Sequence, residues 1–208
     1  MCGLKGSLPY WDWVLDWEDF RFAPIWNDVL GFGGNGSGAE SLGNGSCVST
    51  GPFARLEVLQ FGDLEQSHCL SRGFVEGQAL WDNSSSKLMP AVVDNVLDAS
   101  DYEDFNQRLE LGPHLAIPHG VRGDFTKFTA PYDPVFYLHH CQLDRLWWLW
   151  QQRDIQARLN DYGGGVRGGS SKNNGDLKDV LELHGLGPDV QVSEVMDTQS
   201  GTPLCYRY

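Results

Sequence analysis

The strongest periodic pattern in the chain covers residues 138–159, where apolar side chains recur every three or four positions. This spacing places them on one face of an α-helix. A second helical pattern follows Pro90, and a third begins near Asp101 with Ser100 as a candidate N-cap. The apolar positions of the three predicted helices are Leu138, Leu143, Leu146, Trp147, Trp150 and Ile155; Val92, Val93, Val96 and Leu97; and Tyr102, Phe105 and Leu109.

Irregular segments separate these helices. Residues 10–30 carry Trp and Phe at mixed spacings and predict a turn and a short helix, whereas residues 31–52 are rich in glycine and predict a surface loop. Residues 120–133 read as a connecting loop, residues 166–176 as a flexible Gly/Ser/Asn loop, and residues 190–196 as a strand or edge segment.

Composition narrows the classes of partner. The chain has 208 residues and a formal net charge of -13, so we expect one domain, 1–208, that binds neither nucleic acid nor anionic membranes. No apolar run approaches the roughly 20 residues that a transmembrane helix needs.

The five cysteines allow at most two disulfides, and Cys47 with Cys69 is a plausible pair. Asn-x-Ser sequons at Asn35, Asn44 and Asn83 weakly favour a secreted parent.

The candidate chemistry lies at the start of the strongest helix, where His139 and His140 are adjacent and three tryptophans follow. Imidazole is a ligand for copper, zinc and iron, and bulky aromatic neighbours hold such a ligand rigidly. The alternative is a buried aromatic helix with two hydrogen-bonded core histidines.

The sequence around these two histidines favours a metal site. The stretch Asp133-Pro-Val-Phe-Tyr-Leu-His-His-Cys-Gln-Leu-Asp-Arg-Leu-Trp-Trp-Leu-Trp-Gln151 resembles the second copper motif, CuB, of the tyrosinase and catechol oxidase family. Leu8-Pro-Tyr-Trp-Asp-Trp13, Glu110-Leu-Gly-Pro-His114 and Tyr206-Arg-Tyr208 resemble three further marks of that family, in the family order. The resemblance is greatest to the short tyrosinases of filamentous fungi. It implies a mainly α four-helix-bundle core whose interior faces supply ligands to two coppers.

The same resemblance indicates a missing part. In the family, the histidines of the first copper motif, CuA, precede Pro-Tyr-Trp-Asp-Trp, but here no histidine precedes Pro9. We therefore expect an N-terminally truncated domain that holds copper at CuB only. Two interpretations follow: the chain is part of a copper-dependent phenol oxidase, or it is a catalytically inactive fragment or pseudoenzyme with a partial CuB site.

By resemblance, His114 and His140 match the first and third CuB ligands, and Glu110 matches the acid that assists phenol deprotonation in some members. The second ligand belongs four residues after His114, where this chain has Pro118, and His119 stands one residue late. On a regular helix, position i+5 lies about 140° around the axis, whereas i+4 lies about 40°. A kink at Pro118 would bring His119 to the metal; otherwise His119 points to solvent.

Other residues receive supporting roles. Phe136 resembles the aromatic that packs over CuB, and Leu115 stands where many phenol-hydroxylating members have Asn, which favours catechol oxidation. Asp144 is expected to brace its helix, and His139 to donate a hydrogen bond rather than bind copper. His68 and His184 are interpreted as structural or exposed. Phenolic small molecules or peptidyl tyrosine, with O2, are the substrates that the resemblance implies, in pigment or secondary-metabolite formation.

Overall fold

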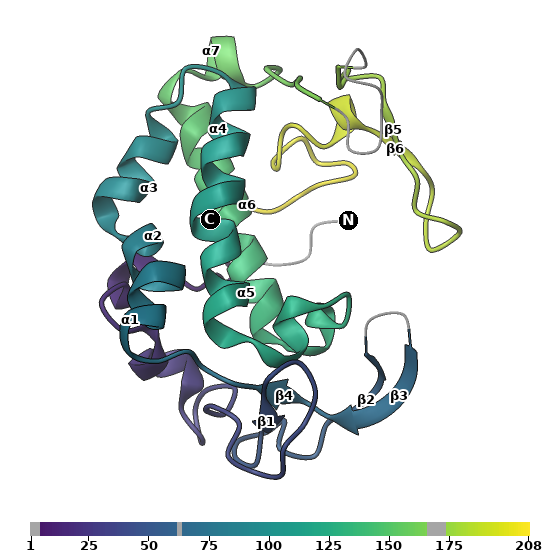
Figure 1. Ribbon diagram of the computed structural model, residues 1–208. Coiled ribbons are helices and arrows are strands. Elements are labelled where there is room, and N and C mark those ends of the chain that lie inside the picture. Colours follow the sequence, from purple (N-terminus) through teal and green to yellow (C-terminus); the bar gives the residue numbers. More distant parts are fainter. Residues whose placement is uncertain (1–4, 62–63, 166–173) are drawn as a thin grey trace. The chain divides into compact units, whose positions relative to one another are not determined.

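The computed structural model describes residues 5–61, 64–165 and 174–208 (Figure 1). Most of the loop predicted over 166–176 therefore lies outside the described residues. The chain divides into two compact units. The larger comprises residues 10–95 and 109–143, and the smaller comprises residues 1–9, 96–108 and 144–208. In the part of the chain that the structure describes, no helix is long and apolar enough to cross a membrane.

The larger unit contains two small antiparallel sheets and a set of short helices. Strand β1 pairs with β4, and β2 pairs with β3. The strands are β1 Ser46–Cys47, β2 Glu57–Phe61, β3 Leu64–Cys69 and β4 Ser71–Arg72. The α-helices are α1 Gly77–Leu80, α2 Ser86–Leu88, most of α3 Pro90–Leu97, α5 Leu115–Val121 and the first half of α6 Val135–Arg153, with π-helical turns at Trp81–Ser85 and Glu110–His114. Single 3-10 turns cover Trp13–Asp16, Phe20–Phe22, Pro24–Trp26, Gly123–Thr126 and Ala130–Tyr132.

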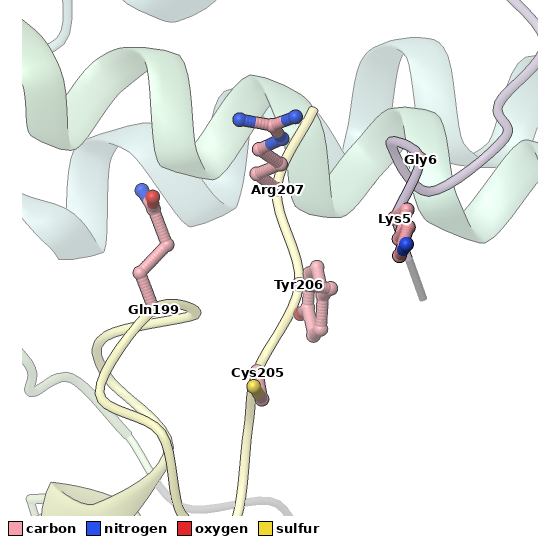
Figure 2. Close-up of a pocket in the computed structure, with 6 residues that line it drawn as sticks. All are labelled: Lys5, Gly6, Gln199, Cys205, Tyr206 and Arg207. Carbon is pink, nitrogen blue, oxygen red and sulfur yellow. The ribbon is translucent and has the colours of Figure 1, made fainter. Parts of the chain in front are cut away.

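The smaller unit contains most of α4 Tyr102–Leu109, the second half of α6, α7 Ile155–Arg158, the strands β5 Val180–Leu181 and β6 Val190–Gln191, and a 3-10 turn at Val192–Glu194. Its core forms around Trp150, which is fully buried, stacks on Phe105 at 5.1 Å and donates a hydrogen bond to the Ala99 carbonyl. The N-terminal segment lies beside the C-terminal one, where Leu8 N donates to Arg207 O. A cavity of about 390 Å³ opens there beside Lys5 and Tyr206 (Figure 2).

The predicted helices are confirmed with altered ends. The pattern over 138–159 corresponds to α6 and α7, which separate at Asp154 because its side chain accepts a hydrogen bond from Ala157 N and begins a new helix. The capping side chain of α4 is Asp101, which accepts from Asp104 N, so the prediction of Ser100 as N-cap is wrong; Ser100 instead donates to Asp101. The β2–β3 hairpin was not predicted.

The disulfide predicted between Cys47 and Cys69 is confirmed, with the two Cα atoms 5.4 Å apart. It ties strand β1 to the end of β3, beside a small core of Val48, Val58 and Leu70. Cys141 is half-buried and forms no disulfide among the described residues.

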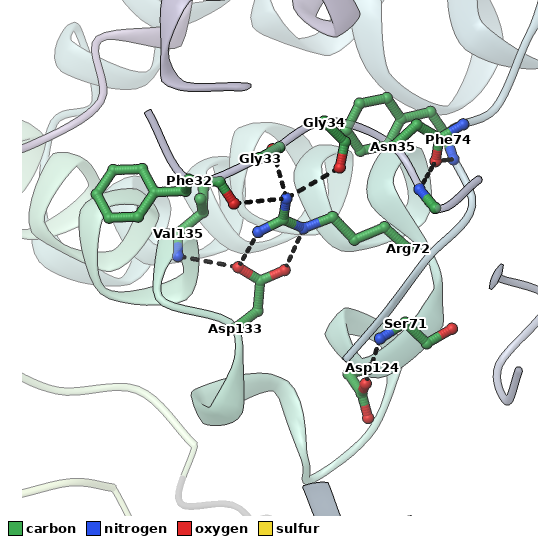
Figure 3. Close-up of polar contacts among 11 residues, drawn as sticks. Phe32, Gly33, Gly34, Asn35, Ser71, Arg72, Phe74, Asp124, Asp133 and Val135 are labelled. Carbon is green, nitrogen blue, oxygen red and sulfur yellow. Dashed lines mark hydrogen bonds and ion pairs between the residues drawn. The ribbon is translucent and has the colours of Figure 1, made fainter. Parts of the chain in front are cut away.

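A buried ion pair holds the start of α6. The Arg72 guanidinium donates from Nε and Nη2 to the two carboxylate oxygens of Asp133, at 2.7 and 2.9 Å (Figure 3). Both side chains are 0% exposed. Asp133 also accepts from Val135 N, and so caps the helix that carries His139 and His140.

The same guanidinium reaches the glycine-rich loop. Its Nη1 donates to the carbonyls of Phe32, Gly33 and Gly34, at 3.2, 2.6 and 3.0 Å. The ring of Trp26 packs against the guanidinium carbon at 4.8 Å. One arginine therefore bonds three carbonyls of an irregular segment and one helix-capping carboxylate.

Candidate metal centre

The first half of α6 is held in place by contacts from Trp11 and Asp12, near the start of the larger unit. Trp11 N donates to the Leu138 carbonyl at 3.1 Å, and Gln142 Nε2 donates to Asp12 Oδ1 at 3.0 Å. His139 and His140 lie between these two contacts. Their position along the helix is thus fixed at both sides.

His114 follows a break in the helical segment between α4 and α5. Gly112 has φ -102° and ψ -108°, which no helix adopts, and Pro113 follows it. Proline is tolerated in the first turn of a helix, so the chain starts a new helical direction there and continues into α5. His114 consequently stands at the beginning of α5 and faces the start of α6.

The structure brings three histidines together. One ligand atom of each of His114, His139 and His140 lies within 4.8 Å of the others. The His114 ring is stacked parallel to His139, with centroids 5.8 Å apart, and is edge-on to His140 at 5.4 Å. In the described part of the chain, this group of three is the one His/Cys/Asp/Glu cluster that could hold a metal ion.

Pro118 explains the orientation of His139. In a regular α-helix the N–H of residue 118 would bond to the His114 carbonyl, but proline has no N–H. His139 Nε2 lies 3.2 Å from that carbonyl oxygen. Since a carbonyl only accepts, Nε2 carries the proton and Nδ1 carries the lone pair. His139 Nδ1 is buried and has no hydrogen-bond partner among the described residues.

Burial keeps these imidazoles neutral. It lowers the pKa of His139 well below the ordinary value, with smaller contributions from the neighbouring His140 and His114. Burial, followed by the charge of His114, lowers the pKa of His140 to about 4. Neutral imidazole is the form that coordinates a metal, so His139 and His140 are in the ligand form at neutral pH.

Aromatic rings cover the histidines. Phe136 lies 4.1 Å from His140 between ring centroids, and Phe125 contacts both Phe136 and His139 at 6.3 and 6.4 Å. Trp13 packs against His139 at 6.4 Å. This apolar surround restricts the rotamers of the His139 and His140 rings.

Glu110 lies at the edge of the cluster. Its Oε2 is 2.6 Å from His114 Nδ1, but the two atoms are not aligned as a hydrogen bond. The carboxylate is half exposed, at 52%. Glu110 therefore lies between a candidate ligand and solvent.

His119 lies outside the cluster. Pro118 does not bend α5 enough to turn the His119 ring toward His114; the side chain is exposed and lines a different pocket with Arg122. His119, which the sequence suggested as a ligand beside His114 and His140, is therefore not part of the described cluster.

The two remaining histidines have no part in the cluster. His68 is buried against Asp124, with Nε2 2.8 Å from Oδ1, and its Nδ1 is 3.0 Å from the Gln66 carbonyl. His184 is exposed in the smaller unit. Their interpretation as structural and exposed residues agrees with these positions.

Sequence reasoning missed the partners of Asp144. Its Oδ2 accepts hydrogen bonds from the hydroxyls of Tyr206 and Tyr208, the former at 2.8 Å. The Tyr-x-Tyr motif therefore fastens the C-terminal segment to α6 within the smaller unit. The role of Arg72 was missed as well, because its partners lie far away in the sequence.

Comparison with known proteins identifies the family of the chain. The model of the common central domain of tyrosinase matches residues 1–153. The chain is 45% identical over 225 residues to tyrosinase-like protein phomQ1' of Diaporthe leptostromiformis, and 42% identical over 209 residues to tyrosinase ustQ of Aspergillus flavus. These alignments cover all of this chain but 59% and 58% of the two relatives, so the chain spans less than two thirds of their length.

A solved structure supports the fold. A polyphenol oxidase from Thermothelomyces thermophila superimposes with a TM-score of 0.73 and 26% sequence identity, over 100% of this chain and 67% of the other. The predicted mainly α fold of the dicopper oxidases is thereby confirmed.

Proposed function

The chain belongs to the tyrosinase family, and from that premise we propose that it holds one copper of an oxidase that converts phenols or catechols to o-quinones with O2. The observation that supports this proposal is the cluster of His114, His139 and His140 under an aromatic cover. Phenolic precursors of pigments or secondary metabolites, and peptidyl tyrosine, are the proposed substrates.

The donor set fits copper. Three imidazole nitrogens suit this metal, and one of them, His139 Nδ1, is a buried lone pair without a partner among the described residues. We expect His114 and His140 to bind as the family resemblance implies, and His139 to supply the nitrogen that Pro118 cannot. Bound copper would supply the redox chemistry, by passing electrons from the substrate to O2.

The protein's own contribution is binding and proton transfer. The edge of Phe136 gives an aromatic substrate a surface beside His140, and Glu110 Oε2 lies where it can accept a hydroxyl proton. Oxidation of one catechol releases two electrons and two protons, and reduction of one O2 to water consumes those of two catechols. The second copper of the family site would have to be held by other histidines, because the described cluster offers ligands for one ion.

The test measures copper in the purified chain after dialysis, together with the Cu(II) electron paramagnetic resonance spectrum. We expect one copper per chain with three coupled nitrogens. His140→Ala should retain no copper, and His139→Ala should bind at least 10–100-fold more weakly, with one coupled nitrogen fewer. His119→Ala is the matched control, since this ring is exposed outside the cluster, and it should behave as the wild type.

Activity is measured as O2 uptake and quinone absorbance with catechol, against free copper. Quinone formation should require the chain to be combined with the histidine-bearing CuA half of a relative, and should vanish in His140→Ala. Two tightly held coppers in the chain alone, or a loss in His119→Ala as large as in His140→Ala, would show that the ligand assignment is wrong.

A further inference from the structure

A second site of a different kind lies on the larger unit. A pocket of about 560 Å³ is lined by the side chains of Asn44, Phe61, His119, Arg122, Thr126 and Lys127 among others. We call it the Arg122 pocket. Its volume falls within the range of small-molecule sites, roughly 300–1,000 Å³.

The charge of this pocket is opposite to that of the protein. The chain carries a net charge of -13, yet the side chains of His119, Arg122 and Lys127 meet in one pocket whose described lining residues include no Asp or Glu. Lys127 Nζ lies over the Phe61 ring at 5.7 Å. Among the described residues, neither Arg122 nor His119 has an ion-pair or side-chain hydrogen-bond partner. Within the described part of the chain, these groups are thus gathered without an acid to neutralise them.

The backbone of Arg122 is strained. Its φ of 59° and ψ of -156° lie in a region that is essentially restricted to glycine. Neighbouring contacts enforce this conformation, since Arg122 N donates to the Pro118 carbonyl and Gly123 N donates to the Gly43 carbonyl. An arginine that keeps a glycine conformation costs stability, so its side chain must serve a purpose elsewhere.

We propose that the Arg122 pocket binds an oxyanion, a carboxylate or phosphate group, of a small molecule. The planar guanidinium of Arg122 matches such a group with two parallel hydrogen bonds, Lys127 adds charge, and His119 offers a ring nitrogen. Asn44 and Thr126 offer neutral hydrogen-bonding groups, and Phe61 gives the ligand an apolar wall.

The test is a titration of the chain with inorganic phosphate and, separately, with benzoate, followed by calorimetry at fixed ionic strength. The protein is produced without N-glycans, since Asn44 lines the pocket and begins a sequon. Binding of both ions indicates a general oxyanion site. Binding of only benzoate or only phosphate identifies the group as a carboxylate beside an apolar body or as a phosphate. Binding of neither overturns the proposal.

Arg122→Gly gives two independent readouts. Affinity should fall at least about tenfold, because charge-assisted hydrogen bonds are lost. The melting temperature should rise by a few degrees, because glycine adopts this backbone freely. Arg55→Gln removes the same charge from an exposed position of the same unit, and should leave affinity unchanged. If Arg122→Gly lowers the melting temperature, or raises it without loss of binding, the arginine is not retained for an anion and the proposal fails.

Discussion

Replacement of Arg72 by leucine tests whether the buried ion pair with Asp133 holds the metal-bearing helix. The substitution removes both hydrogen bonds to Asp133 and leaves that carboxylate fully buried, with Val135 N as its remaining donor among the described residues. It also removes the donor to the carbonyls of Phe32, Gly33 and Gly34. Loss of one partner of a buried pair costs about 3–5 kcal/mol, because an uncompensated charge stays in the interior.

That cost is a large fraction of the roughly 5–15 kcal/mol by which domains are stable. The assay is urea unfolding followed by tryptophan fluorescence, and the expected result is a lower midpoint at an unchanged slope. Copper affinity should fall as well, since Asp133 caps the helix that carries His139 and His140.

The matched control is Arg21, which also binds a carboxylate through two nitrogens, at 2.7 and 2.6 Å from Asp19. That pair is about one quarter exposed, whereas the Arg72 pair is fully buried. Arg21→Leu should therefore cost about 0–1 kcal/mol. Arg72→Leu combined with Asp133→Asn should recover part of the loss, because the amide carries no charge and still caps α6. Equal losses at Arg72 and Arg21, or no recovery in the double variant, would refute the reasoning.

Two further predictions concern His140. The pKa of His140 is lowered from 6.5 to about 4, so the unfolded chain takes up a proton before the folded chain does as the pH falls. The free energy of unfolding of the copper-free protein should therefore be full above pH 6.5 and decline toward pH 4. We expect a decline of about 2 kcal/mol, after allowance for the partial exposure of the ring, in urea unfolding at several pH values. His140→Gln should flatten this decline, and an unchanged decline would contradict the assignment. Copper at 100 times its dissociation constant should raise the wild-type melting temperature by about 5–10 °C in a thermal scan and leave His140→Ala unchanged.

The helices were predictable because their signal is local. Apolar spacing from Leu138 to Trp150 determines which face of α6 is buried, and this pattern needs no knowledge of distant residues. The ends were less predictable, since Asp154 and Asp101 compete with neighbouring residues for the capping hydrogen bonds. Capping depends on side-chain geometry that spacing alone does not reveal.

The site was predictable only in part, because its decisive contacts are long-range. Arg72 and Asp133 are 61 positions apart, and no periodic pattern joins them. The sequence predicted His139 to be a hydrogen-bond donor, and its Nε2 does point at the His114 carbonyl. The sequence could not show that Nδ1 is then buried in the cluster with no hydrogen-bond partner among the described residues.

Pro118 connects the two sites of the larger unit. Proline has no N–H to bond the His114 carbonyl, and His139 takes up that carbonyl with its own ring. The histidine at 119 and the strained arginine at 122 lie together in a basic pocket, one turn further along the same segment. One stretch of chain therefore contributes to both sites. On this reasoning, relatives with histidine in place of Pro118 have no need of a ligand at the position of His139, and relatives with glycine in place of Arg122 lack the anion site.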